Sequence, residues 1–166
     1  MDDVGKGPWL DDDEQKAWRS YLLMNKTLET HMERHLQREF GLSKSDFEIL
    51  VNLSEAENGR MRAFELGRAT QWEKSRMSHH LTRMEKRGLI RREACQARYP
   101  EVVITAEGQA AIEACAPQQA ARIREFFVDV FGPERLAELG KAGDEVVETI
   151  RRHEENDCPP EVRGTC

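Results

Sequence analysis

A basic stretch in the middle of the chain, residues 74–88, carries side chains that suit recognition of nucleic acid. Read at helical spacing, Met77, His80, Leu81 and Met84 share one stripe, while arginines and small hydroxyl side chains occupy the other sides. Arginine can bond two edge atoms of a guanine, and hydroxyl and ammonium groups bind phosphate oxygens. An ordinary amphipathic surface helix would show the same pattern, so the stretch alone leaves both interpretations open.

The distribution of charge favours the first interpretation. The 166-residue chain has a net charge of −6, but residues 60–98 hold eleven basic and four acidic side chains. This segment is therefore +7, and the remainder of the chain is −13. A basic middle between acidic flanks is typical of a DNA-reading module carried on a scaffold that does not bind DNA.

Signatures of other functional classes are missing from the sequence. It contains no P-loop, no GxSxG, no HExxH and no GxGxxG after a predicted strand, so we expect neither an enzyme nor a bound cofactor, and no catalytic residues. The four cysteines show neither CxxC pairing nor zinc-type histidine spacing, so no metal site is expected. Without a run of about 18 apolar residues or a secretory leader, we expect a cytoplasmic protein with no membrane partner.

A long helix is predicted ahead of the basic stretch. Acidic residues from Asp11 onward suit a helix start, an apolar stripe continues to Phe40, and Gly41 provides a stop. A helix of about 30 residues with a single apolar stripe needs a long partner, which indicates a homodimer. Ser43 is expected to cap the next helix, with Asp46 three residues later forming an imperfect capping box.

Two short helices and a hairpin are predicted next. Residues 63–69 and 74–88 are expected to be helices joined by a turn, which is a helix-turn-helix with a basic second helix. Residues 89–105 have the pattern of strand, turn and strand. The predicted fold class is mainly α with a small β-hairpin wing, that is, a winged helix-turn-helix with a helical dimerisation region.

Two further helices are predicted after the hairpin. Thr105 is expected to cap the first, and Pro117 to kink or break it. Gly132 and Pro133 then separate it from the last helix. We expect a disordered N-terminus over residues 1–10, a single domain over 11–152 and a disordered tail over 153–166.

The order of these elements, together with four short strings, resembles the MarR family of bacterial winged-helix transcriptional regulators. The strings run from Leu42 to Leu50, from Ser75 to Leu81, from Met84 to Arg91 and from Ile104 to Gly108. The resemblance covers residues 11–152 and implies a winged helix-turn-helix over about 43–105, with dimerisation helices over about 11–40 and 106–152. It also implies a homodimer that binds pseudo-palindromic double-stranded DNA, most often as a repressor released by a small, often aromatic effector.

The resemblance assigns DNA contacts to particular residues. On the recognition helix the family's DNA-facing positions are those of Ser75, Arg76, Ser78, His79 and Arg83. Thr82 is expected as a further contact, and Lys74 as a phosphate or surface residue. Arg62 is expected near phosphates, and Arg98 at the wing tip is expected near a minor groove. The wing departs from the family pattern, because Gln96 to Pro100 keeps one arginine but lacks the usual aspartate.

Other residues allow more than one interpretation. The stripe places His80 in the core, where it would be a hydrogen-bonded histidine or, alternatively, part of a pocket or a pH sensor. Trp18, Tyr21 and Trp72, with His80, would suit an aromatic effector pocket, and core packing is the alternative. Cys95 near the wing leaves open a redox-sensing regulator. A winged-helix module that binds a protein partner is the alternative from a different functional class.

Overall fold

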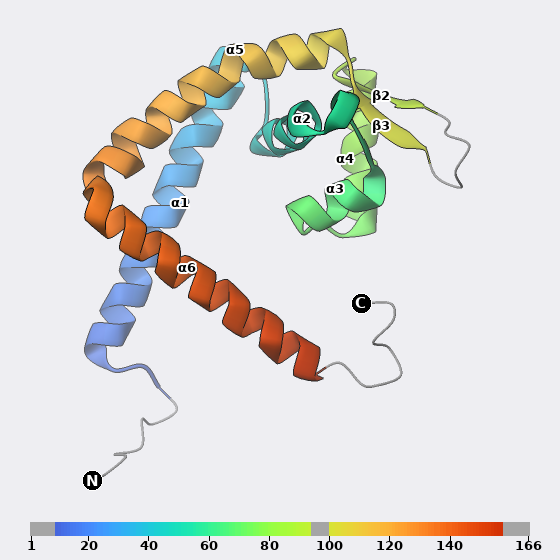
Figure 1. Ribbon diagram of the computed structural model, residues 1–166. Coiled ribbons are helices and arrows are strands. Elements are labelled where there is room, and N and C mark those ends of the chain that lie inside the picture. The colour runs from blue at the N-terminus through green and yellow to red at the C-terminus, as the bar shows by residue number, and fades with distance from the viewer. Residues whose placement is uncertain (1–8, 94–99, 158–166) are drawn as a thin grey trace. The chain divides into compact units, whose positions relative to one another are not determined.

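The computed structural model describes residues 9–93 and 100–157 (Figure 1). The chain divides into two units, residues 1–120 and 121–166, which are described separately. The elements are α1 (Asp12–Phe40), α2 (Lys44–Glu55), a 3₁₀ turn η1 (Glu57–Gly59), β1 (Arg60–Arg62), α3 (Ala63–Thr70), α4 (Lys74–Lys86), β2 (Ile90–Glu93), β3 (Glu101–Ile104), α5 (Ala106–Ile123), a π-helical turn η2 (Arg124–Val128) and α6 (Asp129–Asp157). The mainly helical fold with a small antiparallel sheet confirms the predicted fold class.

Local capping fixes the ends of the first two helices. The Asp11 carboxylate accepts a hydrogen bond from the backbone N–H of Glu14 at 2.8 Å, and Gly41 ends α1 in the left-handed region at φ 64°. Ser43 and Asp46 cap α2 reciprocally, because the backbone N–H of each donates to the side chain of the other, at 2.9 and 3.0 Å. The box that the sequence led us to expect as imperfect is therefore complete.

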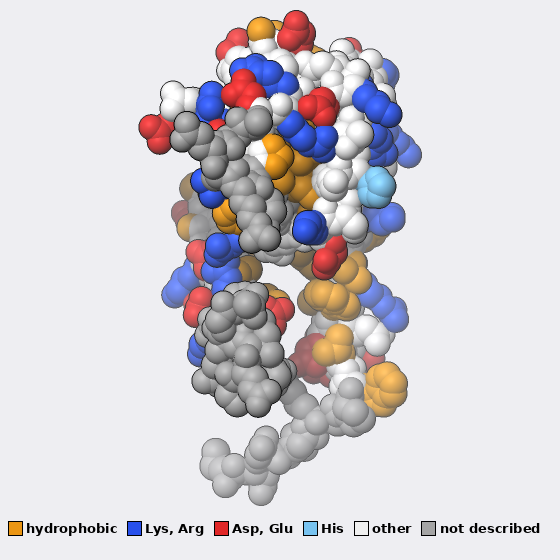
Figure 2. Space-filling view, turned by 90° about the vertical axis from the view of Figure 1, so that its right-hand side faces the viewer, with side chains coloured by type: hydrophobic (Ala, Val, Ile, Leu, Met, Phe, Trp, Pro, Cys, Tyr) orange, Lys and Arg blue, Asp and Glu red, His pale blue; other side chains and the backbone are white. Residues whose placement is uncertain are grey.

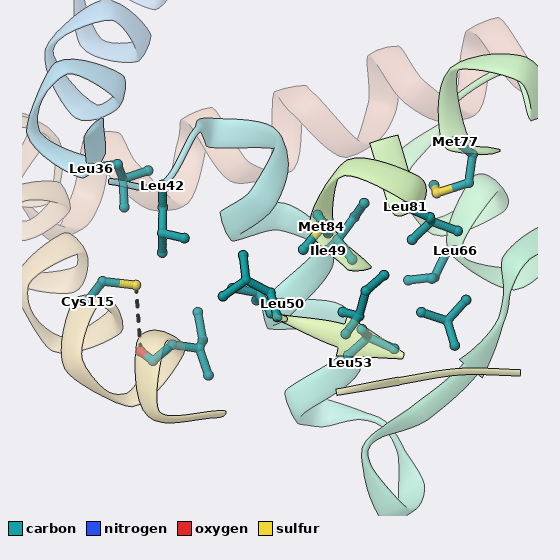
Figure 3. Packing of buried hydrophobic residues seen from close by; sticks show 14 residues of the cluster. Leu36, Leu42, Ile49, Leu50, Leu53, Leu66, Met77, Leu81, Met84 and Cys115 are labelled. Carbon is teal, nitrogen blue, oxygen red and sulfur yellow. Dashed lines mark hydrogen bonds between the residues drawn. The ribbon is translucent and has the colours of Figure 1, made fainter. Parts of the chain in front are cut away.

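One apolar core holds the elements of the first unit together. It is built from the end of α1, the inner faces of α2, α3 and α4, the strands and the first half of α5. Figure 3 shows Leu36 and Leu42 near Cys115 at one end of this core, and Leu66 and Leu81 at the other. Since the apolar stripe of α4 lies in this core, the rotation of that helix about its own axis is fixed.

The sheet has three strands in the order β1-β3-β2, and both pairings are antiparallel. The sequence predicted only the hairpin of β2 and β3, so the prediction missed β1. Met61 in β1 and Arg92 in β2 both pair with Val102 in β3, which is 1% exposed. The central position of β3 explains this burial, and β1 joins the wing to the start of α3.

The start of α5 is locked against the base of the wing. The Thr105 hydroxyl accepts a hydrogen bond from the Gly108 N–H at 3.0 Å and donates one to the Gly88 carbonyl at 2.5 Å, which confirms the predicted cap. A Cβ atom on Gly108 would lie 2.1 Å from the Leu89 carbonyl oxygen, so the helix approaches the wing as closely as backbone permits. The helix continues through Pro117 to Ile123, so the proline does not break it.

The second unit is built mainly from α6. Gly132, at φ 72° and ψ 166°, interrupts its helical conformation just before Pro133, so two helical segments meet where the sequence predicted a boundary. The helix runs to Asp157, beyond residue 152 where the sequence placed the end of the domain. Val146, Val147 and Ile150 on α6 are exposed. In the part of the chain that the structure describes, no helix combines the length and apolarity needed to cross a membrane.

Candidate nucleic-acid interface

The recognition helix predicted from the sequence is α4, and it has one buried and one exposed side. Met77, His80, Leu81 and Met84 are at most 6% exposed, as their stripe predicted. The exposed side carries most of the residues expected to contact DNA: Lys74, Ser75, Arg76, Ser78, His79 and Arg83. Lys and Arg side chains also gather along one edge of this part of the molecule in Figure 2. The helix therefore presents cations, hydroxyls and an imidazole on a rigid support.

The remaining expected contacts lie in other surroundings. Thr82 is half-buried, and its hydroxyl donates to the Ser78 carbonyl at 3.0 Å and accepts from the Arg92 guanidinium at 3.1 Å. Arg62 is half-buried at the junction of β1 and α3. Arg98 falls outside the described residues. The structure thus brings six of the nine expected residues together on the exposed side of α4.

The turn before α4 contributes an aromatic support. Gln71 adopts the left-handed region at φ 56°, and the Trp72 N–H donates to the Gly67 carbonyl at 2.9 Å, so the turn is closed tightly. The Arg76 guanidinium lies over the Trp72 ring, 4.0 Å from its centroid. The same ring meets His80 edge-on, with centroids 5.3 Å apart and planes at 88°.

Polar contacts on both ring nitrogens define the protonation of His80. An Arg83 guanidinium nitrogen, Nη2, lies 2.9 Å from Nδ1. Because a guanidinium only donates, Nδ1 must accept, and the ring proton of neutral His80 is on Nε2. That nitrogen faces Asp46 Oδ1 at 3.0 Å, a close contact that is not aligned as a hydrogen bond. Burial lowers the pKa of His80 below its ordinary value of 6.5 and, with Arg83, outweighs the opposing effect of Asp46.

Asp46 connects α4 to the start of α2. It is 2% exposed, and its Oδ2 accepts from Arg87 Nη1 at 2.7 Å as well as from the Ser43 backbone. Burial raises its pKa, but the hydrogen bonds from Ser43 and Arg87 together outweigh burial and hold the pKa below the ordinary 3.8. Arg87 also donates to the Gly41 carbonyl at 2.7 Å. The Arg87 guanidinium therefore bridges Asp46 at the start of α2 and Gly41 at the end of α1.

The wing is tied to the same helix. The Arg92 backbone N–H and guanidinium donate to the two carboxylate oxygens of Glu85, at 2.9 and 2.7 Å. The guanidinium reaches Thr82 as well. Strand β2 and helix α4 therefore share charged hydrogen bonds in addition to the apolar core.

The four residues expected to line an effector pocket form two separate pairs. Trp18 and Tyr21 stack on each other in α1, with centroids 5.6 Å apart, and each ring is about half exposed. Trp72 and His80 instead pack together beneath α4. Sequence reasoning missed Asp46 as the partner of His80, because its spacing from Ser43 signalled only a helix cap.

The cysteines and the possible metal-binding side chains are further candidates for parts of a functional site. Cys115 is fully buried, and burial raises the pKa of its thiol, which disfavours the reactive thiolate. Cys95, whose redox role the sequence left open, lies outside the described residues, as do Cys158 and Cys166. Within residues 9–93 and 100–157, no group of three or more His, Cys, Asp or Glu side chains is placed to hold a metal ion.

Comparisons with known proteins agree on one family. The model of the MarR family matches residues 40–98. AbsC, a MarR family transcriptional regulator from Streptomyces coelicolor, is 45% identical with a TM-score of 0.84, over 87% of this chain and 99% of AbsC. Sco3205, a MarR family regulator from the same organism solved in complex with DNA, is 34% identical with a TM-score of 0.82, over 92% of this chain and 96% of Sco3205.

A more distant structure shares the fold. NadR in complex with 4-hydroxyphenylacetate is 20% identical with a TM-score of 0.63, over 86% of this chain and 96% of NadR. No curated protein matches the chain.

Proposed function

The chain belongs to the MarR family of transcriptional regulators, and from this premise we propose that it binds double-stranded DNA in a sequence-specific manner. In this proposal it acts without catalytic activity, in the cytoplasm where the DNA lies. The observation that carries it is the two-sided α4, whose apolar stripe is buried while its other side exposes four cations (Lys74, Arg76, Arg83 and Lys86) and two serine hydroxyls. A helix so presented suits the major groove.

Two arginines are assigned to reading bases. Arg76 and Arg83 are exposed on α4, and a guanidinium can bond O6 and N7 of one guanine. Lys74, Ser75 and Ser78, near the start of the helix, are assigned to phosphate oxygens, as is Arg62. His79 and Thr82 are proposed as further contacts of the same helix, and Arg98 as a wing contact.

The experiment begins with selection of bound sequences from a random duplex pool. Affinity for the selected duplex is expected to fall steeply with salt. Arg76→Ala or Arg83→Ala should lose about 1 to 3 kcal/mol at one base pair of each half-site, whereas Lys74→Ala should weaken all duplexes alike and reduce the salt slope by about 1. Arg38→Ala, an exposed arginine of α1, is the charge-matched control. Salt-insensitive binding, or no selected sequence, would refute the proposal.

The regulator is further proposed to be a homodimer. Exposed apolar side chains on α1 (Leu22 and Leu23) and on α6 (Val146, Val147 and Ile150) support this, because apolar helix faces need a covering partner. A pseudo-palindromic selected sequence would fit a two-fold protein. Sedimentation at micromolar concentration should give a dimer mass, and a monomer mass would contradict this part.

We also propose that the dimer represses transcription and is released by a small aromatic ligand. The stacked Trp18 and Tyr21 support this, since exposed rings offer flat apolar surface and a phenol hydroxyl. A panel of aromatic acids, including 4-hydroxyphenylacetate, is to be tested for displacing the selected duplex. Release that is lost in Trp18→Ala but kept in Trp72→Phe would assign the ligand to α1. Release that is unaffected by Trp18→Ala would exclude that residue.

A further inference from the structure

We propose that Trp72 and His80 are positioning residues of the recognition helix, Trp72 holding the guanidinium of Arg76 and neutral His80 holding that of Arg83 for contact with DNA. The inference rests on the proposed DNA-binding function. It explains how Arg76 and Arg83, the two arginines proposed to read bases, are oriented. Both supports lie beneath the exposed side of α4 and contact each other.

The contact with His80 restricts the conformation of the Arg83 side chain. An arginine side chain has several freely rotating bonds, and holding it in one conformation before binding removes part of the entropy lost on binding. His80 is 6% exposed and its ring is fixed between Trp72 and Asp46. The hydrogen bond to Nδ1, at 2.9 Å, therefore holds the Arg83 guanidinium against a rigid ring instead of leaving it to move in solvent.

Arg76 is restrained differently, by the face of an aromatic ring. Trp72 is half-buried, packs against the apolar core and is fixed at its backbone by the bond to Gly67. A guanidinium over an indole face keeps its edge N–H groups directed outward. The stack leaves these donors free to meet a base while restricting the side chain above the ring.

Asp46 determines which form of His80 is present. Its carboxylate faces Nε2, and this favours the tautomer that carries its proton there and leaves Nδ1 as an acceptor. A protonated ring would have donors at both nitrogens and would no longer accept from Arg83. The orientation of Arg83 thus depends on a residue of α2 that cannot itself touch DNA from its 2% exposed position.

The test compares double-mutant cycles measured on DNA. The selected duplex and all its single base-pair variants are bound by wild type, Arg83→Ala, His80→Phe and the double variant. His80→Phe should lower base preference by roughly 2- to 10-fold at the base pair identified by Arg83→Ala, from the worth of one hydrogen bond. The double variant should resemble Arg83→Ala alone, because the support has nothing left to position.

The same design applies to the stacked pair. Trp72→Leu should lower preference by roughly 2- to 5-fold at the base pair assigned by Arg76→Ala, and Trp72→Phe, which keeps a ring face, should retain more. Leu81→Val, a buried change on the same helix, is the structural control and should lower affinity for all duplexes equally. The positioning role would be overturned by any of three results for His80→Phe or Trp72→Leu: effects that add to those of the arginine variant, an equal loss of affinity for all duplexes, or tighter binding.

The experiment distinguishes failure of the positioning role from failure of the proposed DNA-binding function. If wild type selects no sequence, the proposed function fails and the positioning role with it; if wild type selects a sequence but the cycles are additive, only the positioning role fails. Should His80→Phe not fold, ¹⁵N NMR of wild type and Arg83→Ala decides. Nδ1 should be unprotonated at neutral pH in wild type, with a shift that changes in Arg83→Ala, and a protonated Nδ1 would overturn the inference.

Discussion

Replacing Asp46 by alanine should destabilise the protein by about 1 to 3 kcal/mol. The cap that its carboxylate provides to the Ser43 N–H contributes about 1 kcal/mol. Loss of the carboxylate also removes the negative charge that lies 3.0 Å from the buried His80 Nε2. Because this contact is not aligned as a hydrogen bond, it adds at most about 1 kcal/mol. The Arg87 side chain is 44% exposed and can be solvated instead, so its ion pair adds at most about 1 kcal/mol.

Urea unfolding measures this difference. The midpoint should fall while the slope with denaturant stays constant, because the native fold is kept and the change in exposed surface is the same. Asp46→Asn should lose less than Asp46→Ala, since the amide oxygen can still cap α2. In a His80→Phe background Asp46→Ala should cost less than in wild type, because one of its partners is already absent.

The control is Asp12→Ala, an exposed acid in the first turn of α1. Its loss affects the helix dipole alone, which is worth at most about 1 kcal/mol. Protein concentration is held constant across all variants, because association of subunits would couple stability to concentration. If Asp46→Ala costs no more than Asp12→Ala, the reasoning from buried partners is refuted.

Two further predictions concern close packing and pH. Gly108→Ala should lower the free energy of unfolding by more than about 2 kcal/mol, because its Cβ would lie 2.1 Å from a carbonyl oxygen of the wing. Gly67→Ala, whose Cβ would have its nearest contact at 3.4 Å, should leave stability unchanged or raise it. Thermal unfolding of the two variants compares these effects, and equal effects would contradict the prediction. Stability should fall as pH drops below 6.5, because burial and Arg83 keep folded His80 neutral, against the opposing effect of Asp46, while the unfolded chain takes up a proton. Urea unfolding between pH 7.5 and 5.5 should give a smaller drop for His80→Phe than for wild type, and an equal drop would argue against a lowered pKa.

Helix boundaries were predictable because their causes are local in sequence. The acids after Asp11, the serine at Ser43 and the glycine at Gly41 act on backbone groups within a few residues, and the structure places the caps there. The stripe of α4 was predictable for the same reason, since helical spacing alone determines which side chains share a face. The cap at Ser43 and the stripe of α4 also lie within the strings that carry the family resemblance.

Strand β1 was not predictable by such means. It has three residues, Arg60–Arg62, which is too short for an alternating pattern to be recognised. Its conformation comes from pairing with β3, about 40 residues later in the chain, and from the burial of Met61 against the core. A strand of this kind is defined by its partner, and the partner is not visible in local sequence.

The candidate site likewise combines features that local sequence predicts with features that depend on the tertiary fold. Exposure of Arg76 and Arg83 followed from the stripe, but the stack on Trp72 depends on how the turn at Gln71 directs that ring. The sequence placed His80 in the core and left an effector pocket or core packing open for Trp72, but it had no means of showing that the two rings face each other. Side-chain partners across a turn require the tertiary fold.

His80 connects the stability of this fold to the proposed recognition of DNA. A histidine on a buried stripe needs a polar partner, and the partner is Asp46, which also caps α2 and binds Arg87 from 41 residues away. The acceptor left at Nδ1 then faces Arg83 on the exposed side of the helix. Since one carboxylate both stabilises α2 and sets the tautomer under Arg83, Asp46→Asn should alter base preference more than its modest loss of stability would suggest. A loss of affinity equal for all duplexes would instead mean that Asp46 serves stability alone.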